Sequence, residues 1–203
     1  MSSKAYFSTY IDVSKKLLSL PSNSELKKEI FQIQKIDFEG EKWSKENYFA
    51  GYTSYGSMDK LHLSSPNFAF LEKAISRKIA KFVRILEWDI HPRDLAMNSC
   101  WVNIMPRGAH HSFHIHPHSV ISGTYYVDVP QGASPLKFED PRLSQMMLAP
   151  SRKTNCKDGN KNFVSISSTS RDLLLFESWL RHEVPSNQTK KPRLSVSFNY
   201  SFR

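Results

Sequence analysis

Five histidines fall within nine residues in the stretch HHSFHIHPH, which runs from His110 to His118. Neutral imidazole is the commonest protein ligand of divalent transition metals, although a histidine cluster can also be a packed surface that binds nothing. In an extended strand, residues two apart point to the same side, so His114 and His116 could hold one metal ion from one edge. A metal site at this place needs a third ligand from elsewhere in the chain.

The stretch FESWLRHEVPSNQTKKPRLSVSFNYSF supplies a candidate for that ligand and for a neighbouring cation. His182 lies 66 residues after His116, at the end of an apolar run that we expect to be a strand, and Arg193 follows 11 residues later. Strict alternation in RLSVSFN places the guanidinium of Arg193 and the hydroxyl of Ser195 on the same side of one strand. A fixed cation beside a metal would bind an anionic ligand.

The elements that must position these residues are short β-type runs, which begin at about residue 95 and are separated by Pro, Gly, Asn and Asp. They are CWVNIM, VISGTYYVDV, PLKFED, NFVSIS, DLLLFES and RLSVSFNYSF. Six or more short strands without intervening helices predict a β-sandwich, jelly roll or barrel. The segment 150–162, PSRKTNCKDGNKN, shows no periodicity, and we expect it to be a mobile loop.

The N-terminal half is predicted to be mainly helical. After Pro66, apolar residues recur at steps of three and four and form one face of a long helix. Ser22 and Glu25 fit a capping box at the start of an earlier helix. The prediction is a single α+β, mainly β domain over 1–203, in which the helices of 1–94 pack on one face of a barrel formed by 95–203.

Composition narrows the class of protein further. No apolar run approaches the roughly 20 residues of a membrane helix, and the N-terminus lacks the apolar run of a signal peptide. With two cysteines, Cys100 and Cys156, a disulfide framework is not expected, so the prediction is a cytoplasmic protein without a membrane partner. The net charge of +9 permits nucleic-acid binding, but the basic residues after Pro66 fit the solvated face of a helix, and nucleic acid is not the expected partner.

The barrel half closely resembles a known family, an uncharacterised branch of the 2-oxoglutarate- and Fe(II)-dependent oxygenases related to the prolyl 4-hydroxylase group. The resemblance is carried by Trp101 and Asn103, by HIHPHSVISGTYYV, by the FED-P turn ending at Pro141, and by LLLFESWLRHEV with RLSVSFN. It implies a double-stranded β-helix, a jelly-roll or cupin-like barrel that holds iron and 2-oxoglutarate at its mouth.

Carried over by position, the resemblance implies that His114, His116 and His182 are the metal ligands. It also implies that Arg193 with Ser195 binds the distal carboxylate of 2-oxoglutarate. The expected reaction uses dioxygen, converts 2-oxoglutarate to succinate and hydroxylates an unidentified substrate. The sequence departs from the family at His116, where a carboxylate ligand is usual, so the site is expected to be one unit more positive.

Other residues near the predicted site have alternative interpretations. Tyr126, and with less support Asn103 or Ser122, could hydrogen-bond to the cosubstrate, although Tyr126 fits a strand core equally well. His110, His111 and His118 are expected to lie outside the ligand set, since they belong to the entry and exit of the strand. The alternative ligand pair, His116 with His118, is disfavoured because the intervening Pro117 stiffens the chain.

Two other functions fit the same residues. One is a cupin-like dioxygenase that uses His114, His116 and His182 without 2-oxoglutarate, with Arg193 bound to another anion. The other is a non-catalytic module whose metal is structural or sensory. The substrate could be a peptide, a nucleotide or an acidic metabolite, and the oligomeric state is open. We expect the 150–162 loop to cover the barrel mouth when substrate is bound.

Overall fold

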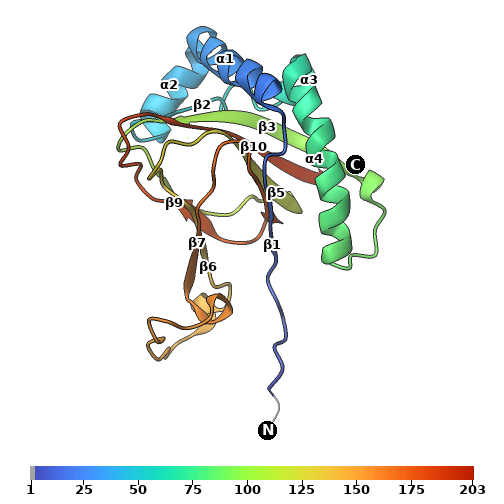
Figure 1. Cartoon of the computed structure of the whole chain (residues 1–203), viewed down its shortest axis with the longest axis vertical. Coiled ribbons are helices and arrows are strands. Elements are labelled where there is room, and N and C mark those ends of the chain that lie inside the picture. The colour runs from blue at the N-terminus through green and yellow to red at the C-terminus, as the bar shows by residue number, and fades with distance from the viewer. Residues whose placement is uncertain (1–2) are drawn as a thin grey trace.

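The structure is a computed structural model, and it describes residues 3–203. Two antiparallel sheets face each other, and helices cover one outer face (Figure 1). The larger sheet has the order β1-β8-β5-β10-β3-β2. Its strands are β1 (Ile11–Ser14), β2 (Tyr52–Thr53), β3 (Leu95–Met105), β5 (Ile121–Asp128), β8 (Leu173–Glu177) and β10 (Arg193–Phe202).

The smaller sheet has the order β4-β9-β6-β7. Its strands are β4 (His111–His114), β6 (Leu136–Glu139), β7 (Phe163–Ile166) and β9 (His182–Val184). The six β-type runs read from the sequence form β3, β5, β6, β7, β8 and β10, which confirms those predictions. Of the other four strands, β4 overlaps the strand expected around His114, and β1, β2 and β9 were missed; β1 and β2 come from the half predicted to be helical.

The helices are α1 (Leu20–Ile36), α2 (Phe38–Asn47), α3 (Leu61–Ser64) and α4 (Pro66–Ile85). Single 3-10 turns lie at Pro92–Asp94, Leu143–Gln145 and Asp158–Asn160. The long helix after Pro66 is confirmed as α4. The predicted capping box of α1 is wrong, because the cap lies three residues before Ser22. Ser19 caps the helix and accepts a hydrogen bond from the backbone N–H of Ser22.

Along the central strands of the larger sheet, successive side chains point to opposite faces, and this alternation separates two hydrophobic layers. Val102, Leu194 and Val196 point outward and pack with α1 and α4 into one core. Met105, Tyr126 and other residues of opposite parity point inward and pack with the smaller sheet into a second core. Because the outward positions bury most of the apolar residues, the inward positions of β3 and β10 are free to carry polar side chains.

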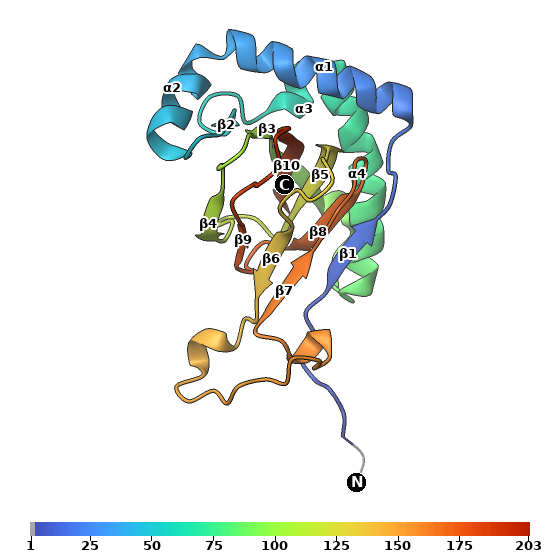
Figure 2. The same cartoon turned by 60° about the vertical axis from the view of Figure 1, so that its left-hand side comes forward.

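The segment between β6 and β7 projects away from both sheets (Figures 1 and 2). It contains the 150–162 loop, and within the described part of the chain no residue of that loop lines either hollow described below. The expectation that this loop covers the barrel mouth in the bound state stays a prediction. Among residues 3–203, no helix has both the length and the apolar character needed to cross a bilayer.

Candidate metal and anion site

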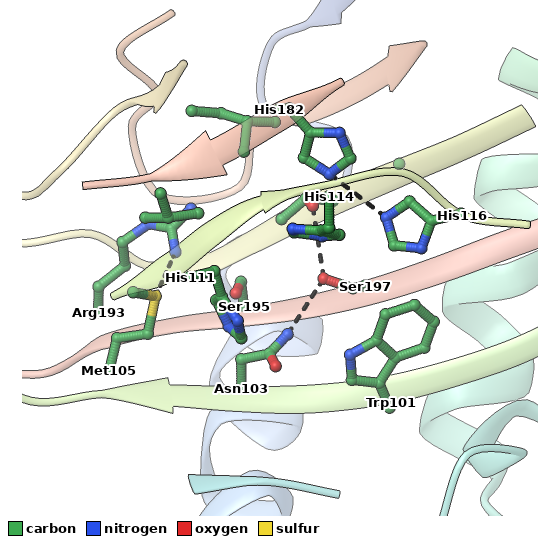
Figure 3. A pocket seen from close by; sticks show the side chains of 14 residues that line it. Trp101, Asn103, Met105, His111, His114, His116, His182, Arg193, Ser195 and Ser197 are labelled. Carbon is green, nitrogen blue, oxygen red and sulfur yellow. Dashed lines mark hydrogen bonds between the residues drawn. The ribbon is translucent and has the colours of Figure 1, made fainter. Parts of the chain in front are cut away.

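His114, His116 and His182 converge at the end of the smaller sheet (Figure 3). His114 is the last residue of β4 and pairs across the ladder with His182, the first residue of β9. One ring nitrogen of each histidine lies within 4.8 Å of the corresponding atoms of the other two. Three candidate metal ligands therefore meet at one place.

The structure corrects the reason given for this convergence. His114 and His116 were expected to share a face of one strand, but β4 ends at His114 and His116 lies two residues beyond its end. The backbone N–H of His116 donates to the carbonyl oxygen of Ser178, 3.0 Å away, and this contact returns the residue to the site. His182 was likewise expected to end a strand, whereas it begins one.

Backbone hydrogen bonds fix the ring orientation of two of the histidines. Nδ1 of His114 lies 2.7 Å from the carbonyl oxygen of Ser112, and Nδ1 of His182 lies 2.8 Å from that of Leu180. A carbonyl only accepts, so each Nδ1 carries the proton and each Nε2 has a free lone pair. This arrangement is common for metal-binding histidines, whose outer nitrogen is held by a carbonyl or carboxylate.

The Nε2 atoms of His116 and His182 face each other at 3.3 Å. In the form that binds a metal, both Nε2 atoms are hydrogen-bond acceptors. A shared proton or a cation therefore has to lie between their lone pairs. Burial, together with the nearby His114, lowers the pKa of His116 and of His182 to about 3. Burial also lowers the pKa of His114. The three rings are therefore neutral at neutral pH, as metal ligation requires.

Arg193, the first residue of β10, is buried beside the histidines with 2% of its surface exposed. Its Nη1 donates to Sδ of Met105 at 2.9 Å, and its guanidinium lies 4.7 Å from the ring centre of Tyr126. Its Nε has no hydrogen-bond partner. None of the ion pairs found among residues 3–203 includes Arg193. A buried cation without a carboxylate is unusual, and it is expected where an anion binds.

The other predicted cosubstrate contacts divide into two groups. Ser195 and Asn103 line the same hollow as Arg193, and the amide of Asn103 donates to the hydroxyl of Ser197 at 3.1 Å while its Oδ1 has no partner. Tyr126 packs in the inner core and also has a buried hydroxyl without a partner. Ser122 is bonded to Ser178 and Asn199 and does not line the hollow.

The inner hollow, as we call this space, encloses about 470 Å³ including the part that is open to solvent. It is lined by Trp101, Asn103, Met105, His111, His114, His116, Gly123, Thr124, Leu136, His182, Val184, Arg193, Ser195 and Ser197. No Asp or Glu occurs in this lining as far as the structure describes the chain. The only fixed charge of the lining is therefore the positive one of Arg193.

Two residues near the site were not predicted from the sequence. His111 lines the inner hollow, and its ring stacks on Tyr48 with centroids 4.1 Å apart. Tyr48, just after α2, has a buried hydroxyl without a partner, and burial raises its pKa. No periodicity marks Tyr48 as a site residue, since it lies 63 residues before His111 and only the fold brings them together. His118 is exposed, outside the group of three.

The donor set fits a divalent transition metal. Three neutral imidazoles with two fixed tautomers suit zinc, iron, copper or nickel, and the absence of a fourth His, Cys, Asp or Glu from the described group leaves further positions for other ligands. An unpaired buried arginine in the same hollow suits a carboxylate, which its planar fork can bind by two hydrogen bonds.

Several solved structures share the fold. SnoN, a non-heme α-ketoglutarate-dependent epimerase from nogalamycin biosynthesis, has a TM-score of 0.66 at 15% identity, covering 96% of this chain and 77% of its own. HygX from Streptomyces hygroscopicus, solved with nickel and 2-oxoglutarate, has a TM-score of 0.64 at 15% identity, covering 95% and 83%. A prolyl-4-hydroxylase from Pseudomonas putida has a TM-score of 0.61 at 13% identity, covering 96% and 94%.

These likenesses confirm the predicted double-stranded β-helix with helices on one face. The sequence matches no curated protein. Residues 99–199, about half of the chain, match the family model described as "Putative 2OG-Fe(II) oxygenase", and this stretch holds all three candidate metal ligands and Arg193. The chain belongs to this 2OG-Fe(II) oxygenase family, as its sequence resemblance predicted.

Proposed function

We propose that this protein is a 2-oxoglutarate- and Fe(II)-dependent dioxygenase that hydroxylates a substrate while 2-oxoglutarate is converted to succinate. The observation that carries the proposal is the buried, unpaired Arg193 in the same hollow as three neutral histidines. A metal site alone would not need this cation. A dianionic cosubstrate that binds the metal at one end and the guanidinium at the other accounts for both features.

His114, His116 and His182 would hold the iron. Bound iron supplies the redox chemistry that couples dioxygen to the oxidative decarboxylation of 2-oxoglutarate. The protein's part is to present three Nε2 or Nδ1 lone pairs in unprotonated form, and the carbonyls of Ser112 and Leu180 do this for two of the rings. Solved structures of HygX and SnoN contain 2-oxoglutarate or α-ketoglutarate with nickel or Fe3+, which supports the same pairing here.

Arg193 and Ser195 would orient the cosubstrate. Both residues lie on the inward face of β10, and the guanidinium can donate two parallel hydrogen bonds to the distal carboxylate. Tyr126 stacks against the guanidinium and limits its movement, while its unpartnered hydroxyl can donate one more bond. Asn103 lines the same hollow, but its free Oδ1 can only accept and therefore cannot hydrogen-bond to the carboxylates of 2-oxoglutarate.

The all-histidine triad changes the charge of the site. Without a carboxylate ligand, the bound cosubstrate supplies the negative charge that would balance the metal and Arg193. We therefore expect bound metal to raise the affinity for 2-oxoglutarate. Thermodynamic linkage then requires that bound 2-oxoglutarate raises the affinity for the metal by the same factor.

One further function has a specific observation in its favour. A triad of three histidines without a carboxylate also suits a cupin-like dioxygenase that does not use 2-oxoglutarate, with Arg193 bound to another anion. Consumption of 2-oxoglutarate distinguishes the two. A closed structural metal site is disfavoured because the described group has three protein ligands and adjoins a hollow.

Metal binding tests which histidines are the metal ligands. We expect one Fe(II) per chain, and we expect His114→Ala, His116→Ala and His182→Ala each to lose stoichiometric metal in anaerobic equilibrium dialysis. His118→Ala is the matched control, because that histidine is exposed in the same segment and should leave metal binding unchanged. Loss of metal in His118→Ala with retention in His114→Ala would reverse the assignment.

A further inference from the structure

A second space, the outer hollow, opens beside the inner one and encloses about 760 Å³ including the part open to solvent. The two share Trp101, His111, His114 and His116, so a molecule in the outer hollow would lie directly beside the candidate metal ligands. Its remaining lining residues are Trp43, Asn47, Tyr48, Thr53, Tyr55, Ser112, Ile115, Pro117 and Asn199.

One side of the outer hollow is an aromatic wall formed by Trp43, Tyr55 and Trp101. Tyr55 meets Trp43 and Trp101 edge to face, with ring centroids 6.3 and 5.0 Å apart. Trp101 in turn lies 6.0 Å from the ring of His116. Tyr55 is half exposed at the rim and Trp101 is buried at the inner end, so the wall leads from solvent to the metal ligands.

Two glycines lie against aromatic rings that line the outer hollow. A Cβ at Gly56 would lie 2.7 Å from the ring of Trp43, and a Cβ at Gly51 would lie 2.5 Å from the ring of Tyr48. Any larger residue would displace an aromatic side chain that lines the hollow, because contacts under 3 Å are not tolerated. The loop between α2 and α3 is therefore shaped around the aromatic residues, although it contributes only a two-residue strand to the sheet.

The outer hollow differs from the inner hollow in the charge of its lining. As far as the structure describes the chain, its lining contains no Asp, Glu, Lys or Arg, and its polar groups are amides, hydroxyls and imidazoles. A cationic ligand would find no carboxylate here in a protein of net charge +9, and an anionic ligand would find its partner at Arg193 in the inner hollow instead.

We propose that the outer hollow binds the primary substrate and that this substrate is an uncharged small molecule whose flat ring stacks on one ring of the wall formed by Trp43, Tyr55 and Trp101. The inference rests on the proposed oxygenase function and specifies its substrate class. Stacking uses the aromatic faces, and the amides and hydroxyls of Asn47, Thr53 and Asn199 supply neutral hydrogen bonds. Nucleotides and acidic metabolites, which the net charge alone permits, are disfavoured because they are anionic.

Three probes of nearly the same shape test the proposal: benzamide is neutral, benzamidine is a cation and benzoate is an anion. Their dissociation constants are measured by ligand-observed NMR on the protein loaded with Zn(II), a redox-inert metal, and with 2-oxoglutarate in excess, so that Arg193 is already occupied. We expect benzamide to bind at least threefold more tightly than either charged probe. Trp43→Ala should weaken benzamide binding about three- to tenfold, in line with the loss of one aromatic stacking contact.

Trp179→Ala is the control, since Trp179 is a half-exposed tryptophan that does not line the outer hollow. This substitution should leave the dissociation constants of all three probes unchanged. The proposal is overturned if benzamidine or benzoate binds as tightly as benzamide, if benzamide does not bind, or if Trp43→Ala and Trp179→Ala behave alike. Tight binding of a neutral proline-containing peptide with no measurable affinity for benzamide would assign the hollow to a peptide substrate instead.

Binding of 2-oxoglutarate is measured by calorimetry on the same samples, which separates the two proposals. If 2-oxoglutarate binds and the order of the probes differs from the expected one, only the substrate class is wrong. If benzamide binds preferentially and 2-oxoglutarate does not bind, the outer hollow is a ligand site and the proposed oxygenase function is wrong.

Discussion

Replacing Arg193 by methionine should weaken cosubstrate binding and stabilise the ligand-free protein at the same time. In the structure the guanidinium is buried, its one hydrogen-bond acceptor is the thioether of Met105, and its Nε has no partner. Sulfur is a weak acceptor, so the charge is poorly compensated in the absence of an anion. Methionine is apolar and long enough to occupy much of the same space beside Tyr126.

The effect on binding follows from the hydrogen bonds that a carboxylate would accept. Each bond to a charged donor is worth about 1.5–3 kcal/mol, and a factor of ten in affinity corresponds to about 1.4 kcal/mol. Loss of a two-bond fork in Arg193→Met should therefore raise the dissociation constant of 2-oxoglutarate by at least roughly a hundredfold. Arg193→Lys keeps the charge without the fork, and a loss of about ten- to a hundredfold is expected.

The effect on stability has the opposite sign. A buried donor without a partner costs about 1–3 kcal/mol, and more when it is charged. Arg193→Met should raise the free energy of unfolding of the ligand-free protein by at least about 1 kcal/mol, which corresponds to about 2–4 °C in Tm per kcal/mol for a chain of this size. Wild-type protein should gain stability on addition of 2-oxoglutarate with metal, and the variant should not.

Differential scanning calorimetry and isothermal titration with 2-oxoglutarate measure both effects on the same samples. Arg77→Met is the control, because Arg77 is exposed on α4 and neither quantity should change. The reasoning is refuted if Arg193→Met binds 2-oxoglutarate with wild-type affinity, or if it destabilises the ligand-free protein, since the guanidinium would then have a partner that the structure does not contain.

Three further outcomes follow from particular contacts. The pKa of buried His111 is about 3, against about 6.5 in the unfolded chain, so the native state gives up stability as the pH falls from about 6.5 toward 3, by up to about 1.4 kcal/mol per pH unit. Urea unfolding of metal-free protein at pH 7 and pH 5 should show a smaller decrease for His111→Asn than for the control His118→Asn, and equal decreases would contradict the burial. Asn187 donates to the carbonyl oxygen of Met105 at 2.8 Å, and Asn187→Ala should cost about 1–3 kcal/mol in unfolding free energy whereas exposed Gln188→Ala should cost little. Deleting residues 150–162 should leave metal binding and uncoupled succinate formation intact and abolish only substrate hydroxylation, whereas loss of metal would show that the loop is structural.

The barrel could be predicted from the sequence because its central strands alternate strongly. Outward apolar residues and inward polar residues follow each other along β10, so the shared face of Arg193 and Ser195 was evident before the structure was known. The long helix α4 was predicted for the same reason, since its apolar positions recur at helical spacing.

The missed features depend on contacts between distant parts of the chain. β4 was drawn too far, to His116, because nothing local shows that the turn after His114 is held by the carbonyl of Ser178. The strands β1 and β2 exist only because β8 and β3 offer them an edge. The outer hollow likewise could not be predicted, because Trp43 and Tyr55 come from the helical half and meet Trp101 only in the fold.

The central claim, that the histidine group and Arg193 together hold metal and 2-oxoglutarate for oxidation, is tested most directly by one titration. Anaerobic Fe(II)-loaded protein is titrated with 2-oxoglutarate while the visible charge-transfer absorption of the bound pair is followed, and the sample is then exposed to oxygen and assayed for succinate. We predict a saturable band at one equivalent of metal, its loss in Arg193→Met at the same cosubstrate concentration, and succinate formed only after oxygen is admitted. A wild-type protein that retains Fe(II) but shows no band and forms no succinate would contradict the claim and favour a three-histidine oxygenase that does not use 2-oxoglutarate.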